Sequence, residues 1–323
     1  MVFNHHLGES SDVDVISLGQ LVIDIVVKPV DRFPQTGTAD LIQQIELHSG
    51  GCALNTAITM GILGVNVGAI GKIGSETFGD FLISDMKKHG VNPEGVRSVP
   101  SHSTSSAIVL ASSEGERSFL YCPGANEELT IDDVDFRLIE KCKILHVGGA
   151  MKLLNLDLAG VLEKAKGLSV TTSLDTDWDP SGRWLEILEP CLGYVDIFTP
   201  SIDEAKEIFG TEKPEEIADA ALSYGIKIVA VKMGKAGCYV KTNEEEHRVP
   251  AFEVDVVDST GAGDAFVGGL LAGIVKGWNL HKAGEFAAAV GAQCVTSLGA
   301  TTGVKSFDKT LAFMENYGNI IQQ

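Results

Sequence analysis

The sequence predicts an α/β fold in which helices cover both faces of a mostly parallel central sheet. From Lys143 onward, short β-like runs such as Ile144–Val147 and Ile228–Val231 alternate with helical patterns such as Ile202–Phe209. Alternation of this kind is typical of parallel sheets that are buried on both faces. The 323 residues are enough for one large α/β domain, and 44% hydrophobic with 21% charged residues is ordinary for a globular protein.

The individual elements follow from hydrophobic spacing. Short apolar runs predict strands, and apolar side chains that recur every three or four residues predict helices. Strands are expected at 13–18, 67–70, 144–147, 169–174, 194–198 and 228–231, and helices at 53–63, 77–89, 156–166, 202–209, 214–224, 265–275 and 280–296. We expect one domain over 13–305, a loose tail over 1–12, and a C-terminal helix over 306–323 that packs on the core.

Two β-rich pieces, near residues 20–50 and 105–122, do not fit this alternation. The runs Ala107–Ala111 and Ser118–Cys122 are separated by a polar stretch with a glycine, which indicates a hairpin. We expect both pieces to form a small antiparallel sheet that acts as a lid. The free edges of such a sheet can pair across a two-fold axis, which makes a homodimer through the lid plausible.

The formal net charge of −19 argues against nucleic acid or an anionic membrane as a partner, because phosphate groups bind to basic surfaces. No apolar run approaches the roughly 18 residues that span a bilayer. The six cysteines are scattered without a C-x-x-C pair, and the first residues show no basic region followed by an apolar core. We therefore expect reduced thiols and a cytoplasmic protein.

The run Asp258-Ser-Thr-Gly-Ala-Gly-Asp264 leads directly into an apolar helix. Gly261 and Gly263 let the backbone approach a ligand closely, and the amides at the start of a helix attract anions. A carboxylate at position 264 can then accept a proton from a hydroxyl that attacks a phosphoryl group. The alternative is that Asp264 only caps the helix among turn glycines, and the composition of the run leaves both interpretations open.

Other motifs surround this run in a fixed order. They are His48-Ser-Gly-Gly-Cys-Ala-Leu-Asn55, Gly71-Lys-Ile-Gly-Ser-Glu-Thr-Phe-Gly79, Gly124-Ala-Asn126 and Leu298-Gly-Ala300. Together with Asp258–Phe266 they resemble the signatures of the ribokinase-type (PfkB) carbohydrate kinase family, from about residue 13 to about 305. The resemblance implies a ribokinase-like three-layer α/β/α fold with a β-sheet lid. It also implies transfer of phosphate from ATP, with Mg²⁺, to a small-molecule hydroxyl.

The resemblance assigns roles to residues on both sides of the transferred phosphate. Asp264 corresponds to the catalytic base, and Gly261, Ala262 and Gly263 to the anion hole. The implied sugar contacts are Asp24, Gly50, Gly51, Asn55 and the lid residue Arg117. Turn or cap roles remain the alternative for Asp24 and Asn55, and an exposed turn arginine is the alternative for Arg117.

The nucleotide side departs from the family pattern. Ser201-Ile-Asp-Glu204 stands where the family usually has Asn-x-x-Glu, so Ser201 replaces the amide on the nucleotide side, while Glu204 is retained to order water around Mg²⁺. Gly234 and Gly237 are expected to border the nucleotide, and Lys232 either meets a phosphate or is a solvated strand end. The resemblance also implies K⁺ or another monovalent cation, held by Asp258, Thr260, Cys294, Ser297, Gly299 and Gly303.

The substrate class is less constrained than the reaction. No cluster of Lys and Arg lies near Asp24–Asn55, which favours an unphosphorylated substrate. We expect a primary hydroxyl of a fructose-like ketose first and of a sugar acid second. A nucleoside kinase of the same fold is the alternative, with Phe33 or Phe119 against the base, and a catalytically weak sugar-binding relative is another. No Gly-x-Gly-x-x-Gly follows the first strand, which disfavours a nicotinamide dehydrogenase.

Overall fold

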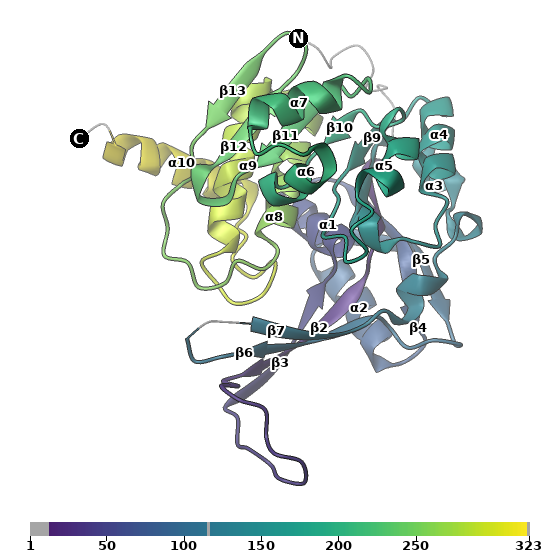
Figure 1. The fold of residues 1–323 in the computed structure, drawn as a ribbon, viewed down its shortest axis with the longest axis vertical. Helices are drawn as coiled ribbons and strands as arrows, with labels where there is room; N and C mark the ends of the chain where they lie inside the picture. Colours follow the sequence, from purple (N-terminus) through teal and green to yellow (C-terminus); the bar gives the residue numbers. More distant parts are fainter. Residues whose placement is uncertain (1–12, 115–116, 322–323) are drawn as a thin grey trace.

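The computed structural model describes residues 13–114 and 117–321, and its centre is a nine-stranded sheet (Figure 1). The strand order is β13-β12-β11-β10-β9-β8-β1-β4-β5, and all pairs from β11 through to β5 are parallel. The strands are β1 (Val13–Gly19), β4 (Val67–Gly74), β5 (Val91–Val99), β8 (Cys142–Gly148), β9 (Thr171–Leu174), β10 (Ile197–Phe198), β11 (Ile228–Lys232), β12 (Cys238–Lys241) and β13 (Glu246–Val249). The predicted parallel sheet is confirmed, with an additional antiparallel extension formed by β12 and β13.

Helices cover both faces of this sheet, as predicted. One face carries α1 (Cys52–Ile62), α2 (Thr77–Lys88), α8 (Ala262–Val275) and α9 (Leu280–Cys294), with α10 (Phe307–Ile321) packed beside them. The other carries α3 (Phe136–Ile139), α4 (Leu158–Gly167), α5 (Leu185–Leu192), α6 (Ile202–Phe209) and α7 (Pro214–Leu222). Neighbouring strand residues point to opposite faces, so that fully buried Ile197 belongs to the first core and fully buried Phe198 to the second.

A second sheet forms the lid, with strand order β3-β2-β6-β7. Its strands are β2 (Val22–Lys28), β3 (Gln44–Gly50), β6 (Ser106–Ala111) and β7 (Arg117–Cys122). The outer pairs are antiparallel, as expected, but β2 and β6 run parallel, so the sheet is mixed. The sheet lies below the central domain in Figure 1, and the loop between β2 and β3 projects beyond it.

The lid sheet has two different faces, because side chains alternate along each strand. Val22, Val26, Ala107 and Val109 share the inner face and pack against Leu298 of the central domain. The register puts Arg117, Phe119 and Tyr121 on this same inner face, opposite Ala111, Val109 and Ala107. The inner face also carries Asp24 and His48, which are direct cross-strand partners.

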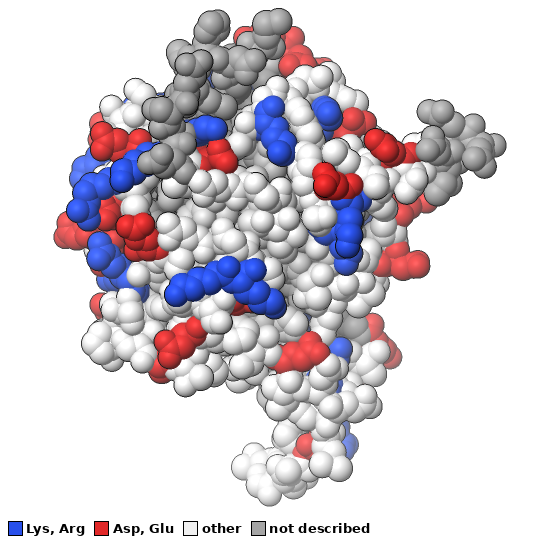
Figure 2. All heavy atoms as spheres, turned by 180° about the vertical axis from the view of Figure 1, so that it is seen from behind, with Lys and Arg blue, Asp and Glu red and all other residues white. Residues whose placement is uncertain are grey.

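The surface and the two ends complete the description. Acidic and basic side chains are mixed on the face seen in Figure 2, without a continuous basic area there. Within the described residues, no helix is long and apolar enough to cross a membrane. Phe307, Leu311 and Met314 of α10 pack against the first core. The tail expected over residues 1–12 lies outside the described residues.

Candidate active site

Asp264 lies in the first turn of α8, and the chain reaches it through a left-handed turn. Gly261 precedes the helix with φ of 74°, and a Cβ there would lie 2.5 Å from the carbonyl oxygen of Ala300, so only glycine fits. The Asp264 side chain is 8% exposed, and its Oδ2 accepts a hydrogen bond of 2.8 Å from Asn55 Nδ2 of α1. Burial raises the pKa of Asp264 to about 7, and nearby Asp175 adds to the rise, while the bond from Asn55 opposes it. A carboxylate with this pKa can act as a general base near neutral pH.

The loop before Asp264 is positioned to hold an anion. Gly261, Ala262 and Gly263 form the N-terminal end of a 14-residue helix, whose first amides have no partners within the helix. A Cβ on Gly263 would lie 3.3 Å from Lys232 Nζ, so the lysine ammonium approaches this end of the helix. An ammonium and free helix amides at one place favour a negatively charged group.

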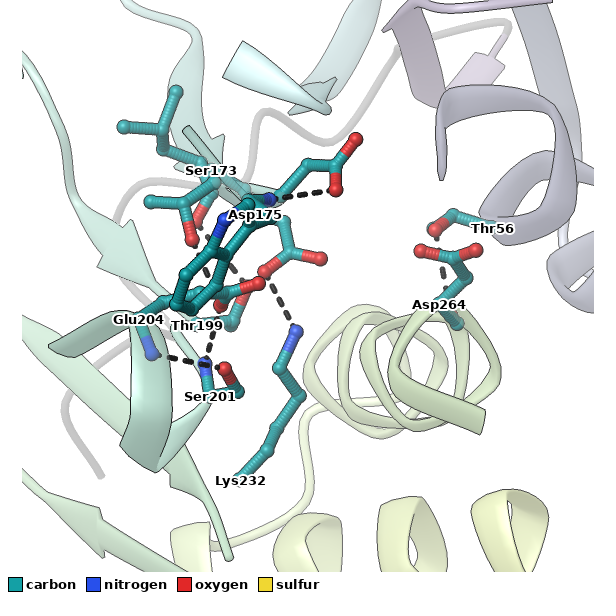
Figure 3. Close-up of polar contacts among 12 residues, drawn as sticks. Thr56, Ser173, Asp175, Thr199, Ser201, Glu204, Lys232 and Asp264 are labelled. Atoms are coloured by element: carbon teal, nitrogen blue, oxygen red, sulfur yellow. Dashed lines mark hydrogen bonds and ion pairs between the residues drawn. The ribbon is translucent and has the colours of Figure 1, made fainter. Parts of the chain in front are cut away.

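Lys232, at the end of β11, has a side chain that is only 12% exposed, and its Nζ donates a hydrogen bond of 2.7 Å to Asp175 Oδ1. In Figure 3 it extends from the strand toward Asp175. Burial alone would lower the pKa of Lys232, but the charges of Asp175 and Glu204 outweigh it and raise that pKa, so the lysine stays protonated. Burial raises the pKa of Asp175 to about 6 although Lys232 opposes the rise.

Ser201 and Glu204 form a capping box at the start of α6 (Figure 3). Ser201 Oγ accepts a hydrogen bond of 3.3 Å from the Glu204 amide, and Glu204 Oε2 accepts bonds from the Ser201 amide (2.7 Å) and the Thr176 hydroxyl (2.9 Å). Ser201 therefore has a local structural role in place of the amide contact of the family pattern. Glu204 is held rigidly, with its carboxylate near the Lys232 ammonium.

Asp175 and Asp177 were not among the predicted site residues. They follow β9 in Leu174-Asp175-Thr176-Asp177, where a buried strand ends at the same edge of the sheet as β11. Burial raises the pKa of Asp177, and Asp177 in turn adds to the raised pKa of Asp264. Two acids spaced by one residue directly after a buried strand were a signal that could have identified them, because ligands of parallel α/β sheets bind at the carboxyl ends of the strands.

The lid forms the wall of the candidate site that faces Asp264 and the anion-holding loop. Asp24 lies in the middle of β2, and burial raises its pKa to about 6, with His48 lowering it and Asp258 raising it. Gly50 leaves room for this carboxylate, because a Cβ at position 50 would lie 2.2 Å from Asp24 Oδ2. Gly51 then begins α1, the helix that carries Asn55. Gly50, Gly51 and Asn55 thus lie along the connection from β3 to α1, and Asp24 lies beside Gly50 on the neighbouring strand β2.

Arg117 reaches across from the lid to the loop before α8. Its Nη1 donates hydrogen bonds to Asp258 Oδ1 and to the Thr260 hydroxyl. Asp258 also accepts bonds from the amides of Thr260 (2.7 Å) and Gly299 (2.8 Å). Burial would raise the pKa of Asp258, but these donors, Arg117 first, lower it. Arg117 is therefore engaged with Asp258, rather than being an exposed turn arginine.

Several of the residues expected around a monovalent cation lie close together, and polar atoms of Asp258, Thr260 and Cys294 are already engaged in hydrogen bonds. The Cys294 thiol donates to the carbonyl oxygens of Ala300 (3.1 Å) and Thr260 (3.6 Å), and a Cβ on Gly303 would lie 2.4 Å from the carbonyl oxygen of Cys294. With Arg117 on Asp258, this arrangement does not fit a bound cation. Ser297 lies in the turn between Cys294 and Gly299.

Gly234 and Gly237 form the tight turn between β11 and β12, closed by a hydrogen bond of 2.8 Å from the Met233 amide to the Gly237 carbonyl. The turn directly follows Lys232, the residue whose ammonium approaches Gly263. For Mg²⁺, no group of three or more His, Cys, Asp or Glu side chains in the described ranges is gathered as a metal site. Glu204, Asp175 and Asp177 still offer the oxygen atoms that Mg²⁺ prefers, and Mg²⁺ keeps several waters when it binds with phosphates.

A lid over the carboxyl edge of a parallel sheet, with a proton acceptor against an anion-binding helix end, defines a phosphotransferase that acts on an alcohol group of a small molecule. The chain matches the pfkB family of carbohydrate kinases over residues 13–306. It belongs to that family and is an ATP-dependent sugar kinase. The predicted family and kinase activity are thereby confirmed.

Known proteins similar to this chain differ in substrate. A sugar kinase of Archaeoglobus fulgidus is 31% identical, covering 75% of this chain and 96% of its own length. An ATP-dependent 6-phosphofructokinase of Thermoanaerobacterium thermosaccharolyticum is 29% identical (91% and 92% covered), and fructokinase-2 of Oryza sativa subsp. japonica is 30% identical (88% and 89%). A ribokinase II structure from E. coli in complex with ATP and Mg²⁺ superposes with a TM-score of 0.84 at 25% identity, covering 94% of this chain and 99% of that one.

Proposed function

We propose that the chain transfers the γ-phosphate of ATP to a primary hydroxyl of an unphosphorylated sugar, with a fructose-like ketose first and a sugar acid second. The observation that carries this proposal is Asp264, a buried carboxylate with a pKa of about 7 beside the start of α8. Asp264 accepts the proton of the attacking hydroxyl, and Gly261, Ala262 and Gly263 hold the phosphoryl group.

The sugar lies between Asp24 and Asn55 in this proposal. Within the described residues, Asn55 Oδ1 is buried without a hydrogen-bond partner, so it is available to accept from a sugar hydroxyl. Asn55 Nδ2 holds Asp264 at the same time, which ties sugar binding to the orientation of the base. Asp24 accepts from a second hydroxyl, with Gly50 and Gly51 leaving the space.

The nucleotide lies on the other side of the anion hole. Lys232 contacts the phosphates, the turn from Gly234 to Gly237 borders the nucleotide, and Ser201 holds Glu204 in place. Glu204 orients water around Mg²⁺, and Mg²⁺ supplies charge neutralisation of the phosphates when bound. A monovalent cation has no part in this proposal, because Arg117 already occupies Asp258.

The charges around Asp24 favour a neutral acceptor. Among the described residues, the charged groups that act on its pKa are His48, Asp258 and Arg117, and Arg117 is already paired with Asp258. A sugar phosphate or a sugar acid would bring further negative charge to this wall without a free basic cluster to receive it. An uncharged ketose has no such cost.

The test is a coupled assay of ADP release over ketoses, aldoses, keto sugar acids, sugar phosphates and nucleosides. We expect a free ketose to give the highest kcat/KM. We expect Asp264→Asn to lower turnover by about 10²–10⁴-fold, which is the usual contribution of a general base. Asp203→Asn is the matched control, because Asp203 is an exposed aspartate in the first turn of α6. Turnover by Asp264→Asn at the level of this control would refute the assignment of the base. A preference for fructose 6-phosphate would refute the neutral acceptor.

A nucleoside kinase is the second candidate, and the inner face of the lid favours it. Phe119 lies on that face beside Tyr121 and is 57% exposed, so a nucleobase has an aromatic surface to stack on. Phe33 is exposed in the projecting loop. Adenosine in the same screen separates the two candidates. The intact Gly-Ala-Gly-Asp run argues against a sugar-binding relative without catalysis.

We also propose a homodimer through the lid and a cytoplasmic location. The outer face of the lid is apolar and exposed, with Ile45 63%, Leu47 43%, Ile108 37% and Leu120 52% exposed. An uncovered apolar sheet face of this kind is typical of an interface. All six cysteines are free, which is typical of a reducing compartment. Light scattering on wild type and Leu47→Glu tests the dimer, which the charge is expected to dissociate.

A further inference from the structure

The lid is attached to the catalytic loop by an ion pair between residues 141 positions apart in the sequence. Arg117 is the first residue of β7, on the inner face of the lid, and Asp258 lies just before the glycine-rich turn of α8. The arginine side chain is 15% exposed and the aspartate 3%, so both charges are largely withdrawn from water. A pair as buried as this is sensitive to the loss of either partner.

The same guanidinium also contacts the anion hole. Arg117 Nη1 donates to the hydroxyl of Thr260, and the next residue, Gly261, begins the loop that we propose for the phosphoryl group. Two other contacts hold the lid at this place. Leu298 packs into the inner face of the lid, and a Cβ on Gly299 would lie 2.8 Å from His48 Nδ1. The positive charge of Arg117 is therefore delivered to the anion hole by a lid that is docked on the loop 298–299.

We infer that Arg117 takes the place of a monovalent metal ion in this kinase: the docked lid supplies the cation beside the anion hole, and transfer proceeds without K⁺. The inference rests on the proposed function, because the benefit of the charge lies in holding the phosphoryl group. Arg117 acts as a positioning residue through Asp258 and Thr260. When the lid closes, Arg117 therefore brings its positive charge beside the transferred phosphoryl group in the same movement.

The surrounding atoms agree with this inference. A cation in this place would need the Asp258 carboxylate and nearby carbonyl oxygens as ligands. Asp258 Oδ1 instead accepts from Arg117 and the Thr260 amide, and Oδ2 accepts from the Gly299 amide. The carbonyl oxygens of Thr260 and Ala300 face the thiol of Cys294. Removing the guanidinium leaves Asp258 as a buried carboxylate that keeps its two backbone amide donors but has no cation to balance its charge, and K⁺ can then enter beside Oδ1.

The experiment compares wild type, Arg117→Met and Arg32→Met in chloride salts of K⁺ and of tetramethylammonium at equal ionic strength. Arg32→Met is the matched control, because Arg32 is an exposed lid arginine that pairs only at the surface, with Asp40. ADP release gives kcat, and thermal unfolding of the ligand-free protein gives a measure of cation binding that does not depend on turnover. Tetramethylammonium is too large for a carbonyl-lined site.

We expect wild type and Arg32→Met to have the same kcat and the same unfolding temperature in both salts. Arg117→Met is expected to lose about 10²-fold in kcat in tetramethylammonium, in the range for losing one electrostatic stabiliser of a transition state. K⁺ is expected to raise the kcat of Arg117→Met about tenfold over its value in tetramethylammonium, still below wild type. K⁺ is also expected to raise the unfolding temperature of this variant alone.

Two results would overturn the inference. One is a wild type whose kcat falls, or whose unfolding temperature drops, when K⁺ is replaced. The other is an Arg117→Met variant that keeps wild-type kcat in tetramethylammonium or that K⁺ does not stabilise. If this variant does not fold, the wild-type comparison decides the matter alone. Absence of turnover with every acceptor would count against the proposed function, and the unfolding temperatures would still test the cation site.

Discussion

Replacing Asp264 with asparagine is expected to slow phosphate transfer by about 10²–10⁴-fold and, at the same time, to stabilise the folded protein at neutral pH. Burial, with a contribution from Asp175, raises the pKa of Asp264 from 3.8 to about 7. Between these two values the folded protein holds a proton that the unfolded chain has released. A carboxyl group whose pKa is higher in the folded state contributes stability below its pKa in the unfolded chain. This contribution is lost as the pH rises through its pKa in the folded protein. Ionised Asp264 is thus a cost to folding above about pH 7.

The magnitude follows from the same values. A difference of roughly three pH units corresponds to about 4 kcal/mol at about 1.36 kcal/mol per unit. Because Asp264 is only 8% exposed, solvent screens little of this free energy. Asparagine keeps the shape and can still accept from Asn55 Nδ2. We expect the free energy of unfolding of Asp264→Asn to exceed that of wild type by about 4 kcal/mol near pH 8, and the two to converge toward about pH 4.

Urea titrations followed by circular dichroism, at several pH values across this range, measure the difference directly. Asp203→Asn is again the control, because its aspartate is exposed in the first turn of α6. Its loss should cost at most about 1 kcal/mol through the helix dipole, with no strong change over the pH range. The reasoning is refuted if Asp264→Asn is no more stable than wild type near pH 8, or if its advantage does not depend on pH.

Three other predictions concern the same site. First, kcat/KM of wild type should rise with pH and level off above about pH 7, as Asp264 loses its proton. Asn55→Ala should move this inflection to higher pH, because the hydrogen bond from Asn55 lowers the pKa of the base; an unmoved inflection would assign it to another group. Second, Lys232→Met should raise the KM for ATP more than that for the sugar in initial-rate measurements, and should lower stability by about 3–5 kcal/mol through its unpaired partner. Equal effects on both substrates would contradict its place at the phosphates. Third, Gly50→Ala should raise the KM for the sugar by tenfold or more and leave that for ATP nearly unchanged, because the new methyl group displaces the lid carboxylate. Unchanged sugar kinetics would exclude that carboxylate from the sugar site.

Sequence patterns were sufficient for the centre of the fold and insufficient for its edges. Strands β8 and β11 are buried on both faces, so their apolar residues stood out in the sequence. Strands β5 and β13 lie at the two ends of the sheet, and in their sequences, Val-Asn-Pro-Glu-Gly-Val-Arg-Ser-Val and Glu-His-Arg-Val, most positions are exposed or only partly buried. An edge strand needs less apolar surface, so hydrophobic spacing alone does not predict it.

The candidate site likewise contains residues whose role could be predicted from the sequence and residues whose role could not. The glycine-rich turn before Asp264 was predictable because its conformation is local: Gly261 needs a left-handed φ wherever the rest of the chain lies. The pairing of Arg117 with Asp258 was not, because it depends on the docking of a lid whose strands come from two separate segments. From the sequence alone, Lys232 could be either a phosphate contact or a solvated strand end. Its ion pair with Asp175 depends on β9, which lies two strands away from β11 in the sheet.

The position of β1 in the sheet has a consequence for how the chain is made. Strand β1 leaves the ribosome before both of its sheet neighbours, and in the finished sheet it lies between them, with β4 on one side and β8 on the other. One of its edges can pair once Val67–Gly74 has emerged, whereas the other stays open until Cys142–Gly148 follows. An open edge on an apolar strand is a template for pairing with other chains. Nascent chains that stall between these two points therefore carry an aggregation risk that the completed protein has removed.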